Sequence, residues 1–380
     1  MCRAHLSRSP ARRWPKYSSR RSPRIRRSKV DGRGAAARVA EAHFVGDTVP
    51  LTLCDRRDGA WYAVLDHGHF GIKLHRSDDG GQTWTEVSAP RYPPKPEGFV
   101  DVDIWGNERE WALGGIWALE VDPSVDGGLW CGTVPGGLFR SSDRGESWTL
   151  VQSLWNHELR VRWSGGGLDD PALHSICVDP RDPDHVTVAV SIGGVWRTTD
   201  GGLSWTPHTK GMKVDYVPPD QAGNPEIQDP HCVVQSPTAP GIFWCQHHMG
   251  IWRSGDDLDS WQEMKVEPSS FGFAVAVDPT DADTAWFVPS QSDEKRAPID
   301  GRVVVTRTRD GGASFDILEN GLPRMFAYDL VLRHALDVAD DGNQLAFGST
   351  TGNLWVTDDK GDQWHNVSTH LPPVYSVRYL

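Results

Sequence analysis

One short pattern recurs six times along this chain, and it constrains the fold more than any other feature. It reads Ser/Thr-x-Asp-x-x-x-x-aromatic, mostly with Gly two residues after the Asp. Successive copies lie between 49 and 64 residues apart, and their acids are Asp79, Asp143, Asp200, Asp256, Asp310 and Asp359. One propeller blade of four antiparallel strands needs about that length. The spacing therefore predicts an all-β protein, a single β-propeller of four-stranded blades.

Each copy is explained as a loop that closes a β-hairpin. The Asp carboxylate can accept hydrogen bonds from loop amides, and Gly supplies the positive φ that the turn needs. The terminal aromatic residue starts the next strand and can bury a large surface between blades. Leu258 stands where most copies have Gly, so we expect a strained or looser loop there.

The six segments resemble the Asp-box, or BNR, repeats of sialidases and other Asp-box propellers. More closely, the chain resembles a bacterial family of sialidase-like repeat proteins that carry a "glycosyl hydrolase" label and are grouped with WD40/YVTN/BNR-like repeats. The stretches that carry the likeness are DHGHFGIKLHRSDDGG, SGGGLDDPALHSICVDPRDP, IQDPH, QHHMGIWRS and FGSTTGNLWVTDDKGDQW. The resemblance covers about residues 38–380 and implies the propeller fold. In enzymes of this kind the boxes lie away from the reaction centre.

Strand counting predicts about seven blades. Innermost strands are expected at 116–123, 174–180, 231–237 and 273–279, and six full units leave VYSVRYL (374–380) over. Because propellers hide their sheet edges, that segment should pair with N-terminal strands to form a last blade shared by the termini. Only 38–45 reads as such a strand, so the sequence leaves open whether the last blade is complete.

The charge is distributed unevenly. Residues 1–30 contain nine Arg, two Lys and no acid, whereas the remainder carries a formal charge of −23. We expect residues 1–37 to form a disordered basic tail and 38–380 to form the propeller. Two alternatives to a disordered arm are a transit peptide, whose composition the tail resembles, and residues from a misassigned start. The tail has no apolar core of a secretory signal, so we expect a cytoplasmic protein.

The acidic body argues against binding of duplex nucleic acid. The sequence contains no run of about 18 apolar residues, so we expect no membrane span.

The unusual polar residues converge on one face. Strands alternate in direction, so the turns at 66–71 and 246–250 and the connections 149–173 and 206–230 all lie opposite the six repeated loops. Aligned innermost strands place Trp117, His174, His231 and Phe273 in a ring at the channel mouth, with Tyr328 and Tyr375 near the equivalent place. The candidate catalytic residues are Asp169, Asp170, Asp229, His174 and His231. The candidate ligand-binding residues are His67, His69, Trp117, Arg160, Trp163, Tyr216, Gln246, His247, His248 and Tyr328.

Several chemistries are compatible with this face. Its histidines could bind a divalent metal ion, act as bases or hold a sugar or phosphate, or simply pack the channel as satisfied hydrogen-bond partners. No CxxC occurs, and the six cysteines are expected to be small buried hydrophobes. Apart from a possible divalent metal, no cofactor is expected.

The function predicted from these residues is binding or hydrolysis of a glycan-like small molecule. A hydrolase would use two carboxylates, with Asp169 or Asp170 paired with Asp229 or Asp329. True sialidase activity is not expected, because no recognisable sialidase motif surrounds the available tyrosines and arginines. The alternative is a non-catalytic scaffold or assembly factor that presents the same face to a protein partner.

Overall fold

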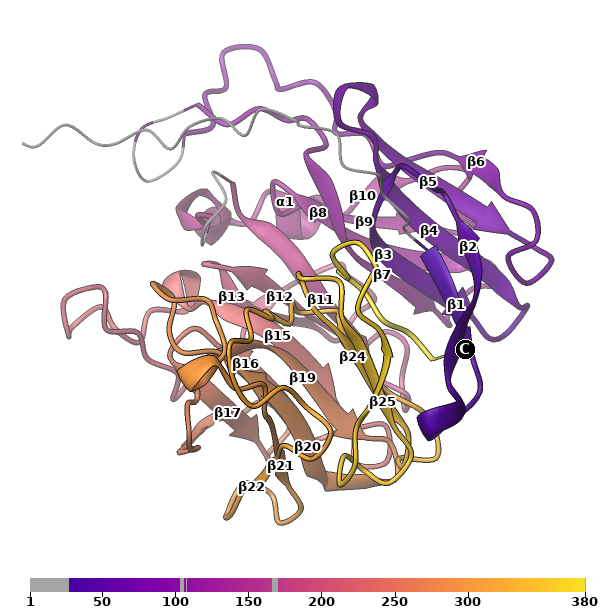
Figure 1. The fold of residues 1–380 in the computed structure, drawn as a ribbon. Helices are drawn as coiled ribbons and strands as arrows, with labels where there is room; N and C mark the ends of the chain where they lie inside the picture. Colours follow the sequence, from indigo (N-terminus) through magenta and orange to yellow (C-terminus); the bar gives the residue numbers. More distant parts are fainter. Residues whose placement is uncertain (1–26, 103–105, 107, 166–169, 380) are drawn as a thin grey trace, which may run out of the picture.

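A computed structural model gives the structure of residues 27–102, 106, 108–165 and 170–379. Within these ranges, six four-stranded antiparallel sheets follow one another along the chain. Their innermost strands contact each other in succession and together surround a central channel. The protein is an all-β propeller, and Figure 1 traces its blades from purple through magenta and orange to yellow.

In every blade the strands run in sequence order from the channel to the rim. The first blade consists of β3 (Thr48–Asp55), β4 (Ala60–Asp66), β5 (Ile72–Ser77) and β6 (Thr85–Val87). The second consists of β7 (Gly115–Asp122), β8 (Gly128–Val134), β9 (Leu138–Ser141) and β10 (Thr149–Leu150). The third consists of β11 (Ala172–Val178), β12 (Val186–Ser191), β13 (Gly194–Thr198) and β14 (Thr206–Pro207).

The second half of the ring repeats this order. The fourth blade consists of β15 (Pro230–Gln235), β16 (Phe243–His247), β17 (Gly250–Ser254) and β18 (Gln262–Met264). The fifth consists of β19 (Gly272–Asp278), β20 (Asp281–Pro289), β21 (Val305–Thr308) and β22 (Asp316–Leu318). The sixth consists of β23 (Leu336–Val338), β24 (Leu345–Gly348), β25 (Leu354–Thr357) and β26 (His365–Ser368).

Short helical turns occur in the connections, and a separate hairpin precedes the first blade. The turns are α1 (Gln152–Trp155), η1 (Gly34–Ala36), η2 (Gly68–Phe70), η3 (Glu158–Arg162), η4 (Pro225–Ile227) and η5 (Ile299–Gly301). The hairpin pairs β1 (Arg27–Asp31) with β2 (Arg38–His43). Part of the segment expected as a tail therefore forms a strand, while residues 1–26 lie outside the described residues.

Across the described part of the chain, no helix is both long and apolar enough to cross a lipid bilayer.

The repeated loops have the predicted hydrogen bonds. In the second copy, the Ser141 hydroxyl lies 2.8 Å from Asp143 Oδ1, which also accepts the Ser147 N–H at 2.9 Å. Equivalent bonds recur in the other five copies. The residue two after the Asp has a positive φ in each copy, including Leu258 at +72°. Leu258 is strained, as expected, and its side chain is buried in the core.

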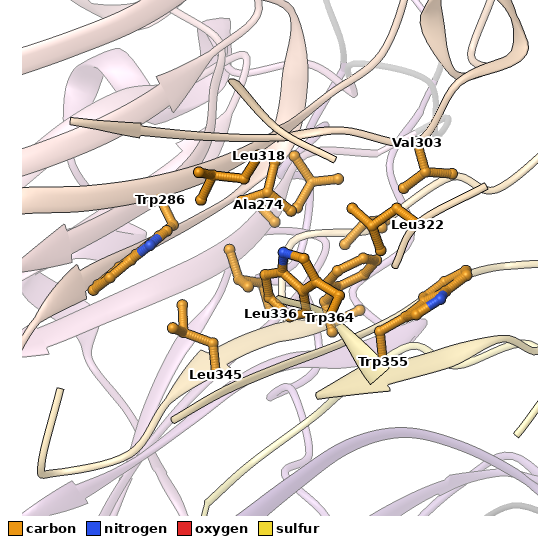
Figure 2. Close-up of a cluster of buried hydrophobic side chains, with 14 of the residues drawn as sticks. Ala274, Trp286, Val303, Leu318, Leu322, Leu336, Leu345, Trp355 and Trp364 are labelled. Carbon is orange, nitrogen blue, oxygen red and sulfur yellow. The ribbon is translucent and has the colours of Figure 1, made fainter. Parts of the chain in front are cut away.

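Large aromatic side chains join neighbouring blades. Figure 2 shows Trp286 and Leu318 of the fifth blade in one buried cluster with Trp355 of the sixth and Trp364, the last residue of the sixth repeated loop. Trp364 is 1% exposed. Comparable clusters of buried hydrophobic residues lie at each boundary from the first to the sixth blade.

The prediction of seven blades is wrong, since the described residues form six. The C-terminal segment does not complete another sheet. It runs parallel to the start of the sixth blade, where His334 bridges Ser376, while β1 and β2 pair with each other. Figure 1 shows β1 and β2 beside the yellow strands, and β2 contacts β26. A cavity of about 610 Å³ remains at this boundary, lined by residues of β1, β3, β24, β25 and the C-terminal segment.

We predict that acid destabilises this protein through its repeated loops. Hydrogen bonds from the hydroxyl groups of Thr83, Ser204 and Ser314 lower the pKa of Asp79, Asp200 and Asp310 to about 2. An unfolded Asp has a pKa of about 3.9, so the unfolded chain binds more protons between these values. The stability from these bonds is complete above about pH 4 and is lost as the pH falls towards 2.

The measurement is the urea midpoint by tryptophan fluorescence between pH 7 and pH 2. An Asp79→Asn/Asp200→Asn variant should be less stable at pH 7 and should lose less of its remaining stability on acidification. If the variant and the parent had the same pH profile, these carboxylates would not be responsible.

Candidate functional site

The innermost strands of the second to fifth blades share a bulge that turns one or two residues out of the ladder. The register skips Trp117 in β7, His174 in β11 and His231 in β15, and β19 skips Phe273 together with Ala274. A bulge leaves its extra residue unpaired and redirects the side chain. His231 stacks on Phe273 with ring centroids 4.6 Å apart. The predicted ring residues therefore lie at one end of the channel, two of them in direct contact.

Arg333 completes this ring from the sixth blade. Its guanidinium lies 4.9 Å from the centroid of Trp117 and 5.6 Å from that of Phe273. Counted back from the turn after the innermost strand, His334 is the equivalent of His231. Tyr328, predicted near that place, is instead 74% exposed on the preceding loop. Tyr375 lines the cavity between the sixth and first blades.

The polar centre of the mouth consists of Asp229, His231 and His248, all in or next to the fourth blade. Asp229 Oδ2 lies 3.6 Å from His231 Nε2 and 3.4 Å from His248 Nδ1. The backbone holds the group in place, because the His248 N–H donates to the Asp229 carbonyl at 2.9 Å. Among described residues, these three form the group whose ligand atoms lie within 4.8 Å of one another and could hold a metal ion.

The charges of this centre follow from burial and proximity. Burial opposes ionisation of Asp229, but contacts with His231 and His248 hold its pKa well below the usual range. The same contact with Asp229 raises the pKa of His248. Burial lowers the pKa of His231. The centre therefore presents an ionised carboxylate shared between two imidazoles.

Aromatic rings form a wall beside this centre. His248 makes edge-to-face contacts with Tyr216 and Phe271, each with ring centroids 5.8 Å apart. The Tyr216 hydroxyl donates to the Ile227 carbonyl at 2.6 Å, which fixes the ring. Tyr216 is 44% exposed and Phe271 is half-buried, so both rings have surface available to a ligand.

Three other predicted site residues are buried hydrogen-bond partners. His174 Nε2 lies 2.7 Å from the Pro230 carbonyl, and Gln246 Nε2 donates to the Ser270 carbonyl at 2.8 Å. His247 Nε2 accepts the backbone N–H of Asp229 at 3.1 Å. Burial lowers the pKa of His247 to about 3 and that of His174 well below its usual value. These three side chains therefore match the alternative in which they pack the channel as satisfied hydrogen-bond partners.

Arg160 and Trp163 do not face the channel mouth, contrary to the prediction. Arg160 is 3% exposed, donates to Asp101 Oδ2 at 2.8 Å and lies over the Trp155 ring. Trp163 is fully buried against Trp196. The connection between the second and third blades folds inward through α1 and η3, so these side chains have no surface to offer a ligand.

The remaining predicted residues are scattered. His67 and His69 lie on the turn of the first blade, where His67 Nδ1 is 3.7 Å from Asp47 Oδ1 and His69 is exposed. Asp170 is half-buried at the start of the third blade, and Asp169 lies outside the described residues. Asp329, considered as a second carboxylate, accepts hydrogen bonds from the Ser349, Thr351 and Asn353 side chains.

A second polar group, inside the channel, was not predicted. Glu120 of β7 and Asp337 of β23 line a cavity of about 490 Å³ together with Arg378. Burial raises the pKa of both carboxyl groups. Each stands three residues after its ring position, Trp117 or His334, where the fourth blade has the apolar Val234 three residues after His231. That interruption was the available sequence signal.

The chain has similarities to known proteins in sequence and in structure. No protein-family model matches this chain. A xyloglucanase of Paenibacillus sp is 26% identical over 267 residues, which are 63% of this chain and 23% of that enzyme. The crystal structure of an ancestral GH74 enzyme matches 83% of this chain and 38% of its own, with 15% identity and a TM-score of 0.58. YCF48 from Cyanidioschyzon merolae matches 85% of this chain and 87% of its own, with 13% identity and a TM-score of 0.50.

The solved structures support the propeller fold, and the sequence similarity is to xyloglucanases. These likenesses therefore do not support the sialidase-like part of the resemblance. The chain spans less than a quarter of the length of the Paenibacillus enzyme.

We predict that Arg160 stabilises the fold without contributing to ligand binding. Arg160→Met leaves Asp101, whose side chain is fully buried, with one partner fewer. Breaking a buried ion pair in this way costs about 3 kcal/mol of unfolding free energy. Lys73→Ala, which breaks an exposed pair with Glu86, is the control and should cost less than about 1 kcal/mol. Equal urea midpoints for the two variants would contradict this role.

Proposed function

We propose that this protein binds a glycan of the xyloglucan type at the mouth of its channel. The observation that carries the proposal is the contact of Tyr216 and Phe271 with His248, directly beside the ionised carboxylate of Asp229. Sugar-binding sites need apolar faces and a few placed polar groups, and both are present here. The likeness to the Paenibacillus xyloglucanase over 63% of this chain supports the choice of glycan.

The exposure of each side chain determines the role that we assign to it. The rings of Tyr216 and Phe271 would pack against the C–H faces of sugar units, because they combine accessible apolar area with fixed orientation. His248, whose side chain is 22% exposed, would hydrogen-bond a sugar hydroxyl, while Asp229 at 2% exposure would orient the imidazole from below. Arg296, whose guanidinium lies 5.4 Å from the Phe273 centroid, adds a charged rim.

The proposal is for binding and does not include hydrolysis. Hydrolysis by two carboxyl groups needs one of them protonated to act as the acid. Asp229 is held ionised by its histidines, and Asp329 is occupied by three hydrogen bonds within the sixth blade. The proposal therefore gives neither Asp229 nor Asp329 the role of the acid.

A protein partner is the second candidate, and an exposed apolar loop favours it. Met325, Phe326 and Tyr328 are 66%, 83% and 74% exposed on the connection between the fifth and sixth blades. Clustered apolar side chains of this kind mark interaction surfaces more often than isolated ones do. This loop supplies none of the aromatic contacts of the Asp229 centre, so the two functions can be tested separately.

We predict that Tyr216→Ala and Phe271→Ala each weaken binding of xyloglucan oligosaccharides at least tenfold, measured by isothermal titration calorimetry. Tenfold corresponds to about 1.4 kcal/mol of binding free energy. Tyr328→Ala is the matched control, since it removes an exposed aromatic ring from a different loop, and it should bind like the parent.

Absence of binding by the parent protein across a panel of xyloglucan and related oligosaccharides would overturn the proposal. Loss of binding in Tyr328→Ala together with full binding in Tyr216→Ala would move the site to the loop that carries Met325.

A further inference from the structure

The contacts within the Asp229 centre are longer than a typical charge-assisted hydrogen bond. Asp229 Oδ2 faces two ring nitrogens, His231 Nε2 at 3.6 Å and His248 Nδ1 at 3.4 Å. A hydrogen bond between a carboxylate and an imidazolium is shorter, about 2.7–2.9 Å. The ligand atoms of Asp229, His231 and His248 all lie within 4.8 Å of one another.

The protonation of His231 sharpens this argument. Its Nδ1 lies 2.6 Å from the Gly272 carbonyl, which can only accept, so Nδ1 carries the proton. Nε2, the other ring nitrogen, faces the carboxylate of Asp229 at 3.6 Å. Imidazole nitrogen and carboxylate oxygen are both ligands of divalent metal ions.

A metal ion accounts for both observations. Zn²⁺ binds His nitrogen and carboxylate oxygen at about 2.0–2.2 Å in tetrahedral geometry, which places neighbouring ligand atoms about 3.3–3.6 Å apart. The separations from Asp229 Oδ2 fall at or near this range. A metal-bound His also usually donates its other ring N–H to a carbonyl or carboxylate, as His231 does to Gly272.

We propose that Asp229, His231 and His248 bind one divalent transition-metal ion of the Zn²⁺ class. Two imidazoles and one carboxylate leave a fourth position open, as in metal sites that bind water or a substrate oxygen. His248 is the most exposed of the three ligands, so the open position faces the side on which Tyr216 and Phe271 lie. The site goes beyond the proposed glycan binding and does not depend on it.

The test uses the full chain without an affinity tag, stripped with a chelator and titrated with Co²⁺ and Zn²⁺. We expect one ion per chain, and visible Co²⁺ absorption of the intensity typical of four-coordinate sites. His248→Gln should weaken Zn²⁺ binding at least tenfold in competition with a chromophoric chelator, and Asp229→Asn should do the same. His69→Gln, which removes an exposed histidine of the first blade, should bind like the parent.

His248→Gln is the informative variant, because its side chain is 22% exposed and its loss should leave the fold intact. An unchanged urea midpoint of the metal-free variant verifies this. No stoichiometric binding by the parent, or equal binding by His248→Gln and the parent, would overturn the metal site. Glycan titrations of metal-free and Zn²⁺-loaded protein separate the two proposals, since metal binding without glycan binding rejects only the proposed function.

Discussion

The structure depends on one constraint: a four-stranded blade cannot bury both of its faces by itself. Each blade must cover its apolar faces with a neighbour, and large aromatic residues such as Trp286 and Trp364 provide the contact. A fully buried Trp removes about 150–250 Å² from water, so a few per boundary dominate the packing. Among the described residues, this packing joins each blade to the next one, from the first blade to the sixth. At the remaining boundary the hairpin of β1 and β2 and the C-terminal segment take the place of a further blade.

Packing the blades also creates the candidate site. Because every innermost strand starts on the same face, a bulge at its start sends one side chain to the channel mouth, as with His231 and Phe273. Connections from the neighbouring blades then add Asp229, Tyr216 and Phe271 around this point. The centre has a buried side, where charges are held in fixed positions, and an exposed aromatic side. The metal and glycan proposals use these two sides of one arrangement.

Particular residues show how far the sequence could predict this site. Aligning strands by the turn that follows them predicts the ring of Trp117, His174 and His231, since the spacing within a strand is rigid. Arg160 and Trp163 could not be placed in this way. Their connection reads as a polar loop, yet it packs inward on Trp155 and Trp196, and the length and composition of a loop do not encode that choice. The connection before the sixth blade differs in length from the other connections. The sequence alignment therefore predicted Tyr328 near the ring position that His334 occupies.

The sequence by itself determined the fold class and the repeated loops. Those features arise from hydrogen bonds and strand periods among residues close together in the chain, and such interactions leave a local pattern. Only the tertiary structure decided that six blades form, that the termini do not build a seventh, and that His231 and His248, but not His67, approach Asp229. These outcomes depend on packing between segments that are far apart in the chain, where small differences in loop length and side-chain volume decide which groups meet.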